Sequence, residues 1–463
     1  MKNILILPVL SLLLLTPACG WFVEGYDVSP NSPTEVTNPL LLSSSELATF
    51  TVYSGQLARL SAVLIQQQAG TDFQFVDIAN YVILEGDLDN EWENIYSKCL
   101  VNEDQLIAQA GDANPYYRGI ARVLKAMALG VATDLWGDVP LREAGQAIQG
   151  SDFYNPAYDS QEQVFADLQA LLSSAITDLS QAPEANAELP GADDIIHGGD
   201  PARWIKTAWI LKARFANRLS KRDPQSATLA LEYLANAGLT GSEDDANAIF
   251  GDNGNEWNQW YAFLIQRGGY MMMGEYLVDL LESIDDPRLP LYAAVSQDPA
   301  DPYKGTPLGS TDQSTSTIGA YFASPAAPAP LVTYVEARFI EAEARLRNND
   351  ADGAAAAFNE AVIAHVEQVT GAAAPTSYVA AQASETGATI TLEKIMTHKY
   401  VALFTQIEAY AEWRRTGIPQ LSPNPGGQVA GIPRRLPTAS VERLYNTNAV
   451  VVSDLLQQVW WDQ

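Results

Sequence analysis

The sequence is poor in the side chains on which most enzymes and metalloproteins depend. It holds only three histidines among 463 residues, and none of them stands in a metal-ligand spacing such as HExxH. It also has no GxSxG elbow and no glycine-rich phosphate loop. We therefore predict a non-enzymatic protein without catalytic residues, metal ligands or cofactors. Of the histidines His197, His365 and His398, the last two fall within helical patterns and are expected to be structural.

Basic residues are also scarce, because 27 Lys and Arg face 56 Asp and Glu, which gives a net charge of −29 at pH 7. Such a surface repels phosphate backbones, so we expect no nucleic-acid partner. One stretch departs from this balance: after the helix-start signal Asp200-Pro201, a helical pattern carries a basic face. We predict that this face forms ion pairs inside the protein through Arg203, Lys206, Lys212, Arg214, Arg218 and Lys221.

The abundant acidic residues leave two further interpretations open. A surface glycosidase needs only a suitably placed pair of carboxylates, but abundance alone does not indicate such a pair, and we predict no turnover. The alternating acids of Asp87, Asp89, Glu91 and Glu93 resemble the start of a calcium loop, although Trp92 stands where an EF-hand needs glycine. A looser calcium site remains an alternative to a solvated helix start, where acids suit the helix dipole.

The N-terminus carries an apolar run that is too short to span a membrane. Lys2, the apolar run and the small residues before Cys19 are typical of a secretory signal peptide, which we assign to residues 1–18. Cys19 is then the lipid-modified first residue of a bacterial lipoprotein; a soluble secreted protein cut nearby is the alternative. Residues 19–42, rich in proline and polar residues, form a tether. With Cys19 acylated, Cys99 lacks a disulfide partner and is expected to be buried.

Residues 43–463 are predicted to form one mainly helical domain. The strongest pattern covers Pro115–Trp136, where apolar residues recur at helical spacing. Small residues such as Gly130 leave room for a second helix to approach closely. Trp136 is expected to fill the core below the end of this helix. A further helix is predicted without interruption over Thr391–Arg414.

Small and aromatic residues over 333–368 have the spacing of a tetratricopeptide hairpin. The first helix of this hairpin begins with Thr333 and Glu336 at the spacing of a capping box. Helical patterns elsewhere in the chain also occur in pairs. We predict a mainly α fold in which four tetratricopeptide-like hairpins form a scaffold, with a loop-rich second half packed on it; the hairpins cover residues 43–109, 115–179, 201–237 and 333–368.

Aromatic residues cluster in two loop-rich segments and are the candidate ligand contacts. A sugar-binding site needs aromatic faces that stack on the C–H face of a pyranose, with amides and carboxylates for the hydroxyls. The stretch from Asp252 to Tyr261 supplies both kinds of group, although Trp257 and Trp260 would also suit one buried helical face. The ligand-binding candidates are Trp257, Trp260, Tyr261, Tyr303, Tyr321 and Phe322.

Several separate stretches, in one order along nearly the whole chain, resemble a single family. The chain is similar to the SusD/RagB nutrient-binding outer-membrane lipoproteins. Within these motifs, Trp136, Trp204 and Trp413 are expected to be structural. The matching pieces are Cys19, the tether YDVSPNSPTEV, TDLWGDVPL at 133–141, GGDPARWIK at 198–206, DDPRLPLY at 285–292, VEARFIEAEA at 335–344 and YAEWRRTGIP at 410–419.

The resemblance implies an α-rich fold with four tetratricopeptide-like hairpins, anchored through Cys19 to the outer membrane and exposed at the cell surface. It further implies a non-catalytic protein that captures oligosaccharides, or peptides, for a SusC-like TonB-dependent transporter. The alternative is a lipid-anchored tetratricopeptide scaffold whose only ligand is another protein. Binding of a small ligand by the isolated soluble domain distinguishes the two.

Overall fold

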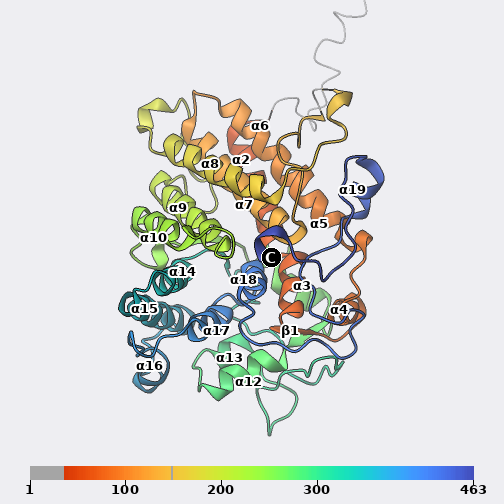
Figure 1. Ribbon diagram of the computed structural model, residues 1–463, viewed down its shortest axis with the longest axis vertical. Helices are drawn as coiled ribbons and strands as arrows, with labels where there is room; N and C mark the ends of the chain where they lie inside the picture. Colours follow the sequence, from red (N-terminus) through yellow and green to blue (C-terminus); the bar gives the residue numbers. More distant parts are fainter. Residues whose placement is uncertain (1–35, 148–149) are drawn as a thin grey trace, which may run out of the picture.

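The computed structural model describes residues 36–147 and 150–463, which are mainly helical (Figure 1). Cys19, the signal peptide and the tether up to residue 35 lie outside the described residues. The first described helix, α2, begins at Asn38, so the last residues of the predicted tether are helical. Among the described residues, no helix is both long enough and apolar enough to cross a membrane.

Three of the four predicted hairpins are present as pairs of helices that pack on each other. In Figure 1 these pairs follow one another from the top of the molecule down its left side, and α8 also packs on α9. The predicted mainly helical fold with tetratricopeptide-like pairs is therefore confirmed, and these three pairs are its most regular part. The pairs are α7 (Pro115–Trp136) with α8 (Gln161–Leu179), α9 (Pro201–Arg218) with α10 (Ser226–Ala237), and α14 (Tyr334–Arg347) with α15 (Ala351–Thr370).

The first predicted hairpin is less regular than expected, because each of its two helices changes geometry. The chain breaks at Gly55, where an added Cβ would lie 2.3 Å from the carbonyl oxygen of Thr51. This close approach requires glycine and separates α2 from α3. The return helix passes through a π-helical stretch before it continues. The elements are α2 (Asn38–Ser54), α3 (Gln56–Leu64), α5 (Asp89–Glu93), η2 (Asn94–Leu100) and α6 (Val101–Ala110).

Helix α7 is buried along most of its length and packs against α2, α6, α8 and α9. Its glycines permit this: an added Cβ on Gly130 would lie 2.6 Å from the ring of Phe215 in α9. Trp136, at the end of α7, is buried, and its Nε1 donates a hydrogen bond to the carbonyl oxygen of Pro437 at 2.9 Å. The predictions of a close helix approach and of a structural Trp136 are confirmed.

The basic face of α9 forms buried ion pairs with other helices. Arg214 binds Glu336 of α14 at 2.6 Å, and Arg218 binds Glu408 of α18 (Ile407–Thr416) at 2.6 Å. Arg203 and Lys212 donate to backbone carbonyls instead. The prediction of internal pairing is thus correct for four of the six residues, since Lys206 and Lys221 also pair with acids. We call the following residues the buried charge cluster: Arg214, Arg218, Arg415, Glu336, Glu343, Glu408 and Glu412.

The helix predicted over Thr391–Arg414 is in fact two helices, α17 (Leu392–Ala402) and α18 (Ile407–Thr416). Between them Thr405 adopts a φ of +71°, which interrupts the helical backbone. The apolar spacing continues across the break because both helices pack on the core, so the pattern alone could not reveal it. The prediction of one uninterrupted helix was wrong.

Two short antiparallel sheets hold the loop-rich second half in place, and the first of them joins it to the N-terminal part of the chain. In the first, β1 (Gln68–Gly70) pairs with β3 (Met271–Met273), and in the second, β2 (Ala246–Ala248) pairs with β4 (Ala329–Val332). The remaining helices are α4 (Phe73–Ala79), α11 (Gln259–Gln266), α12 (Glu275–Ser283), α13 (Leu289–Tyr292), α16 (Thr376–Gln382) and α19 (Ser440–Tyr445). Short 3-10 turns are η1 (Glu85–Leu88), η4 (Ser151–Phe153), η5 (Pro183–Ala185), η6 (Ser242–Asp244) and η7 (Trp460–Asp462).

The last described residues, in η7, return to the middle of the molecule (Figure 1). Trp461 is completely buried, with the guanidinium groups of Arg218 and Arg414 at 5.2 and 4.8 Å from its ring. Asp462 binds Lys221 of α9 at 3.0 Å and Arg434 at 2.7 Å. This segment therefore closes the core beside the buried charge cluster.

Glu103 of α6 is a destabilising residue, because it is completely buried and neither carboxylate oxygen has a hydrogen-bond partner among the described residues. Burial raises its pKa well above the ordinary value, although Lys125 lowers it. We expect Glu103→Met to raise the free energy of unfolding by about 1–3 kcal/mol at pH 8. Chemical denaturation of both proteins measures this change.

The sign of the pH dependence follows from this raised pKa. The wild type loses stability as the pH rises from the unfolded value of about 4.3 toward the folded pKa, because folding opposes ionisation of Glu103. The gain from Glu103→Met should therefore be larger at pH 8 than at pH 5. Glu93→Met, at an exposed position of α5, is the control and should change little. An equal gain at both pH values would contradict the explanation.

Candidate functional site

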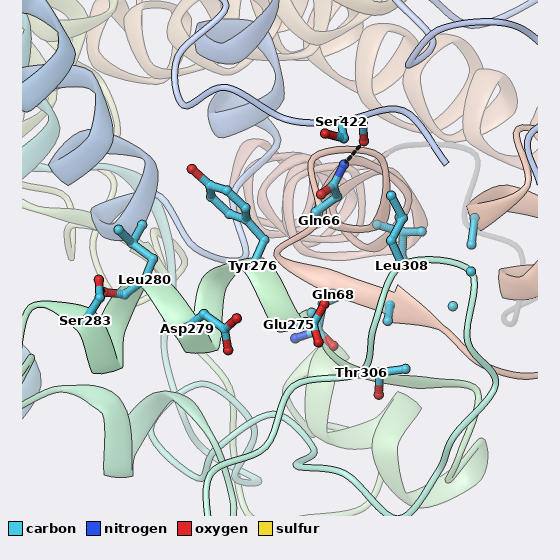
Figure 2. Close-up of a pocket in the computed structure, with 16 residues that line it drawn as sticks. Gln66, Gln68, Glu275, Tyr276, Asp279, Leu280, Ser283, Thr306, Leu308 and Ser422 are labelled. Carbon is cyan, nitrogen blue, oxygen red and sulfur yellow. Dashed lines mark hydrogen bonds between the residues drawn. The ribbon is translucent and has the colours of Figure 1, made fainter. Parts of the chain in front are cut away.

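A cavity of about 510 Å³ opens between the β1–β3 ribbon, helix α12 and the loop around Thr306 (Figure 2). Helix α12 contributes Tyr276, Asp279, Leu280 and Ser283, because residues at these spacings share one face of a helix. The loop lies directly on the start of α12, where an added Cβ on Gly305 would be 2.3 Å from the Cα of Glu275. The cavity is therefore built from parts of the chain far apart in sequence.

The polar groups of this cavity come from β1 with its neighbour Gln66 and from α12. Gln66 has a left-handed φ of +62°, and its Nε2 donates to the carbonyl oxygen of Ser422 at 2.6 Å (Figure 2). Gln68 donates through Nε2 to the sulfur of Met273 at 3.1 Å. The carboxylates of Glu275 and Asp279 are exposed and accept no hydrogen bond from another described side chain or backbone group. These two carboxylates are therefore available to a ligand.

Among the described residues that line the cavity, Tyr276 is the one with an aromatic ring. Its ring is half-buried and meets the ring of Tyr400 edge to face, with centroids 6.0 Å apart and an interplanar angle of 85°. Burial, and to a lesser degree the nearby Glu393 carboxylate, raises the pKa of the Tyr276 hydroxyl, which stays protonated and can donate. The cavity thus combines an aromatic ring with free carboxylates.

A second aromatic surface lies at the other end of the same ribbon. Phe73 and Tyr270 stack with centroids 4.7 Å apart and an interplanar angle of 20°, and we call this pair the aromatic platform. Phe73 is 64% exposed and has a φ of +45°, which is unfavourable for a residue with a side chain. Strain of this kind at an exposed aromatic residue points to a functional surface.

The aromatic residues predicted from sequence are not brought together in this cavity. Trp257 and Tyr261 form a half-buried pair, with ring centroids 5.2 Å apart, and Tyr303 and Tyr321 are half-buried elsewhere in the second half. Trp260 and Phe322 are only 2% and 5% exposed and pack around Phe404, so neither ring can stack on a ligand in this conformation. Trp260 instead follows the alternative interpretation as a core residue.

Another large cavity, of about 650 Å³, lies beside α14 and α15. Among the described residues that line this cavity, Tyr334 is the one with an aromatic ring. It is only 7% exposed, and its hydroxyl donates to Glu360. This ring cannot present a face to a sugar. We therefore take the α12 cavity as the candidate site.

The other singled-out residues have structural surroundings. Trp204 is completely buried and donates through Nε1 to Asp194 at 2.7 Å, and Trp413 is 7% exposed. Burial lowers the pKa of both His197 and His398 to about 4, so these buried rings are neutral at pH 7. His365 lies 2.6 Å from the guanidinium of Arg288. Cys99 is completely buried, as predicted.

The acidic run of Asp87 to Glu93 makes contacts within the protein. Asp87 accepts a hydrogen bond from the backbone nitrogen of Leu84 at 2.9 Å, at the start of η1. Asp89 accepts from the backbone nitrogen of Val441 at 3.0 Å, which connects α5 to α19. Among the residues that the structure describes, no three His, Cys, Asp or Glu side chains are grouped to hold a metal ion.

Solved structures of similar fold cover almost the whole chain. A SusD/RagB family protein from Bacteroides thetaiotaomicron is 24% identical with a TM-score of 0.76, over 92% of this chain and 99% of that one. A chitin-binding SusD homolog from Flavobacterium johnsoniae is 21% identical with a TM-score of 0.77, over 91% and 98%. A protein described as chitin-binding is 24% identical with a TM-score of 0.80, over 92% and 100%. These likenesses show a shared fold.

The comparison with curated protein sequences gives no match. A family model, in contrast, covers most of the chain: the SusD-like model, described as starch-binding and associating with the outer membrane, matches residues 30–437. The match includes the helix pairs, both small sheets and the α12 cavity. The chain therefore belongs to the SusD-like family.

Proposed function

We propose that this protein is a cell-surface lipoprotein that binds oligosaccharides in the α12 cavity and delivers them to a SusC-like TonB-dependent transporter. It does so without cleaving them. Cys19 carries the lipid that holds it to the outer membrane. Peptides are the second ligand class that the resemblance allows. The binding of glycans by family members and by two neighbours of similar fold supports this choice.

The observation that carries the proposal is the combination of groups in one cavity. Within about 510 Å³, a volume typical of small-ligand sites, Tyr276 offers a half-buried ring, and Glu275 and Asp279 offer free carboxylates. Sugars are recognised by such sets, since the ring contacts the C–H face and the polar groups bind the hydroxyls. The exposed platform of Phe73 and Tyr270 extends the aromatic surface beyond the cavity.

Calorimetric titration of residues 20–463 with neutral oligosaccharides and oligopeptides, with product analysis of the same mixtures, tests the function. We expect saturable binding of oligosaccharides without turnover. If neither oligosaccharides nor oligopeptides bind, the protein-scaffold alternative is favoured. Release of sugars would favour a glycosidase. Trp257 and Tyr261 form a second candidate contact, and their replacement by alanine tests it in the same assay.

Removal of the Tyr276 ring should weaken this binding. We expect Tyr276→Ala to lower the affinity at least tenfold, equal to about 1.4 kcal/mol of binding free energy, because the ring is the aromatic contact of the cavity. Tyr154→Ala removes a ring that is 62% exposed and does not line the cavity, and should bind like the wild type. Equal affinities for the two variants would exclude the α12 cavity as the site.

The strain at Phe73 can be separated from its ligand role with two substitutions. Phe73→Ala and Phe73→Gly both remove the ring of the platform and should weaken oligosaccharide binding to a similar extent. Only glycine adopts a positive φ without penalty, so Phe73→Gly should be about 1 kcal/mol more stable than Phe73→Ala. Denaturation curves give the stability difference, and titration gives the affinities. Equal stabilities would show that Phe73 is not strained.

A further inference from the structure

We propose, building on the proposed oligosaccharide site, that the α12 cavity selects by charge: it accepts uncharged sugars and amino sugars and rejects uronic acids and sulfated sugars. The selection would come from the carboxylates that line the cavity and from the acidic residues around them. It goes beyond glycan binding as such, because it names the chemical class of glycan.

The charge of the cavity wall is entirely negative among the described residues that line it. Glu275 and Asp279 are the two ionisable carboxylates, and the described lining includes no lysine, arginine or histidine. Neither carboxylate has an ion-pair partner within the described part of the chain. Their charge is therefore uncompensated, unlike that of the carboxylates in the buried charge cluster.

Further acids surround the same face of α12. Partial desolvation, then the Asp301 carboxylate, raises the pKa of Asp279, and the same causes raise that of Glu282. Glu393 of α17 acts in the same direction on Tyr276. A ligand in the cavity is thus within the field of several carboxylates from three separate segments.

The nearby basic groups do not offset this field. Lys394 of α17 binds Glu385 at 2.7 Å, and Lys304 does not line the cavity. Arg267 lies over the Tyr270 ring at 5.9 Å, on the aromatic platform, and does not line the cavity. A carboxylate or sulfate on a bound sugar would therefore meet like charge without a cation to pair with.

Like charges in a partly desolvated cavity repel strongly, and salt screens this repulsion over a distance of about 10 Å at 0.1 M. Charge selection should therefore be largest at low ionic strength. A neutral sugar does not experience this repulsion. An amino sugar gains attraction from the same carboxylates.

The test uses neutral hexasaccharides of glucose and of N-acetylglucosamine, each compared with a charged form of the same backbone. Oxidation of C6 turns primary hydroxyls into carboxylates, and removal of the acetyl groups exposes amines. Affinities are measured by calorimetry at 20 mM and 300 mM salt. At 20 mM salt, the oxidised form of a hexamer that binds should have at least tenfold lower affinity than its neutral form. The difference should shrink at high salt, and the amine form should bind at least as well as the acetylated one.

Two variants separate charge from the loss of a hydroxyl contact. Glu275→Gln/Asp279→Asn should raise the affinity ratio of oxidised to neutral hexamer at least fivefold. The control Glu243→Gln/Glu367→Gln removes two exposed carboxylates from the 650 Å³ cavity and should leave that ratio unchanged. If the neutral and oxidised hexamers bind with equal affinity, the charge selection is wrong, but the proposed function is not affected. No binding of either neutral hexamer, together with no binding of other neutral glycans, would overturn the proposed function.

Discussion

Replacement of Arg415 by methionine should lower the free energy of unfolding by about 3–5 kcal/mol. Arg415 is buried in α18 and binds both Glu343 of α14 and Glu412 of its own helix. Its removal leaves two buried carboxylates short of a positive partner. Burial alone would raise the pKa of Glu343, but the Arg415 guanidinium lowers it to about 2. Urea denaturation at pH 7 measures the loss.

Two comparisons test this explanation. Arg347 binds the same Glu343 at 2.7 Å but is one-third exposed, so Arg347→Met should cost less than about 1 kcal/mol. The wild-type contribution of Glu343 is present above about pH 4.3 and is lost as the pH falls toward 2. The deficit of Arg415→Met should therefore be smaller at pH 4, where the unpaired carboxylates bind protons. A deficit that is the same at pH 4 and pH 7 would indicate lost packing instead.

Trp461→Ala is expected to lower the free energy of unfolding by about 3–5 kcal/mol, because it leaves a large cavity in the core. The ring is completely buried between two arginines, so its loss also removes two cation–π contacts. Thermal and chemical denaturation measure the effect.

The neighbouring Trp460 is the natural control for this prediction. Its ring is half-buried, and the guanidinium of Arg222 lies 5.1 Å from it. Trp460→Ala should cost only about 1 kcal/mol, since an exposed cation–π contact contributes less than a buried ring. If both substitutions cost the same amount, Trp461 is not an essential part of the core.

Much of the helical scaffold could be predicted from local signals. The pattern from Pro115 to Trp136 gave the bounds of α7, and Asp200 accepts hydrogen bonds from the start of α9 as a capping residue should. Thr333 also caps α14, but Glu336 does not complete the predicted capping box, because its carboxylate binds Arg214. The break at Thr405 could not be foreseen, since it depends on how α17 and α18 pack.

The candidate site was largely hidden from sequence analysis. The density of tryptophan drew attention to Trp257 and Trp260, yet the structure buries the second of these. Tyr276 reaches the cavity only because α12 lies beside β1. The pairing of β1 with β3, which brings them together, joins residues more than two hundred positions apart. Phe73 follows a short strand, and its positive φ leaves no trace in the sequence pattern. Exposure, and not composition, decides which rings can meet a ligand.

The position of η7 has a consequence for the timing of folding. Asp462 binds Lys221, a residue 241 positions earlier, and Trp461 fills the space between arginines of α9 and α18. During synthesis the core beside Arg218 stays open until Trp461 and Asp462 have emerged, although Arg218 can already pair with Glu408. Contacts over such separations form slowly, so the chain should stay loosely folded until then. For the proposed lipoprotein this delay is an advantage, because a chain that has not yet folded can still be threaded through a narrow secretion channel.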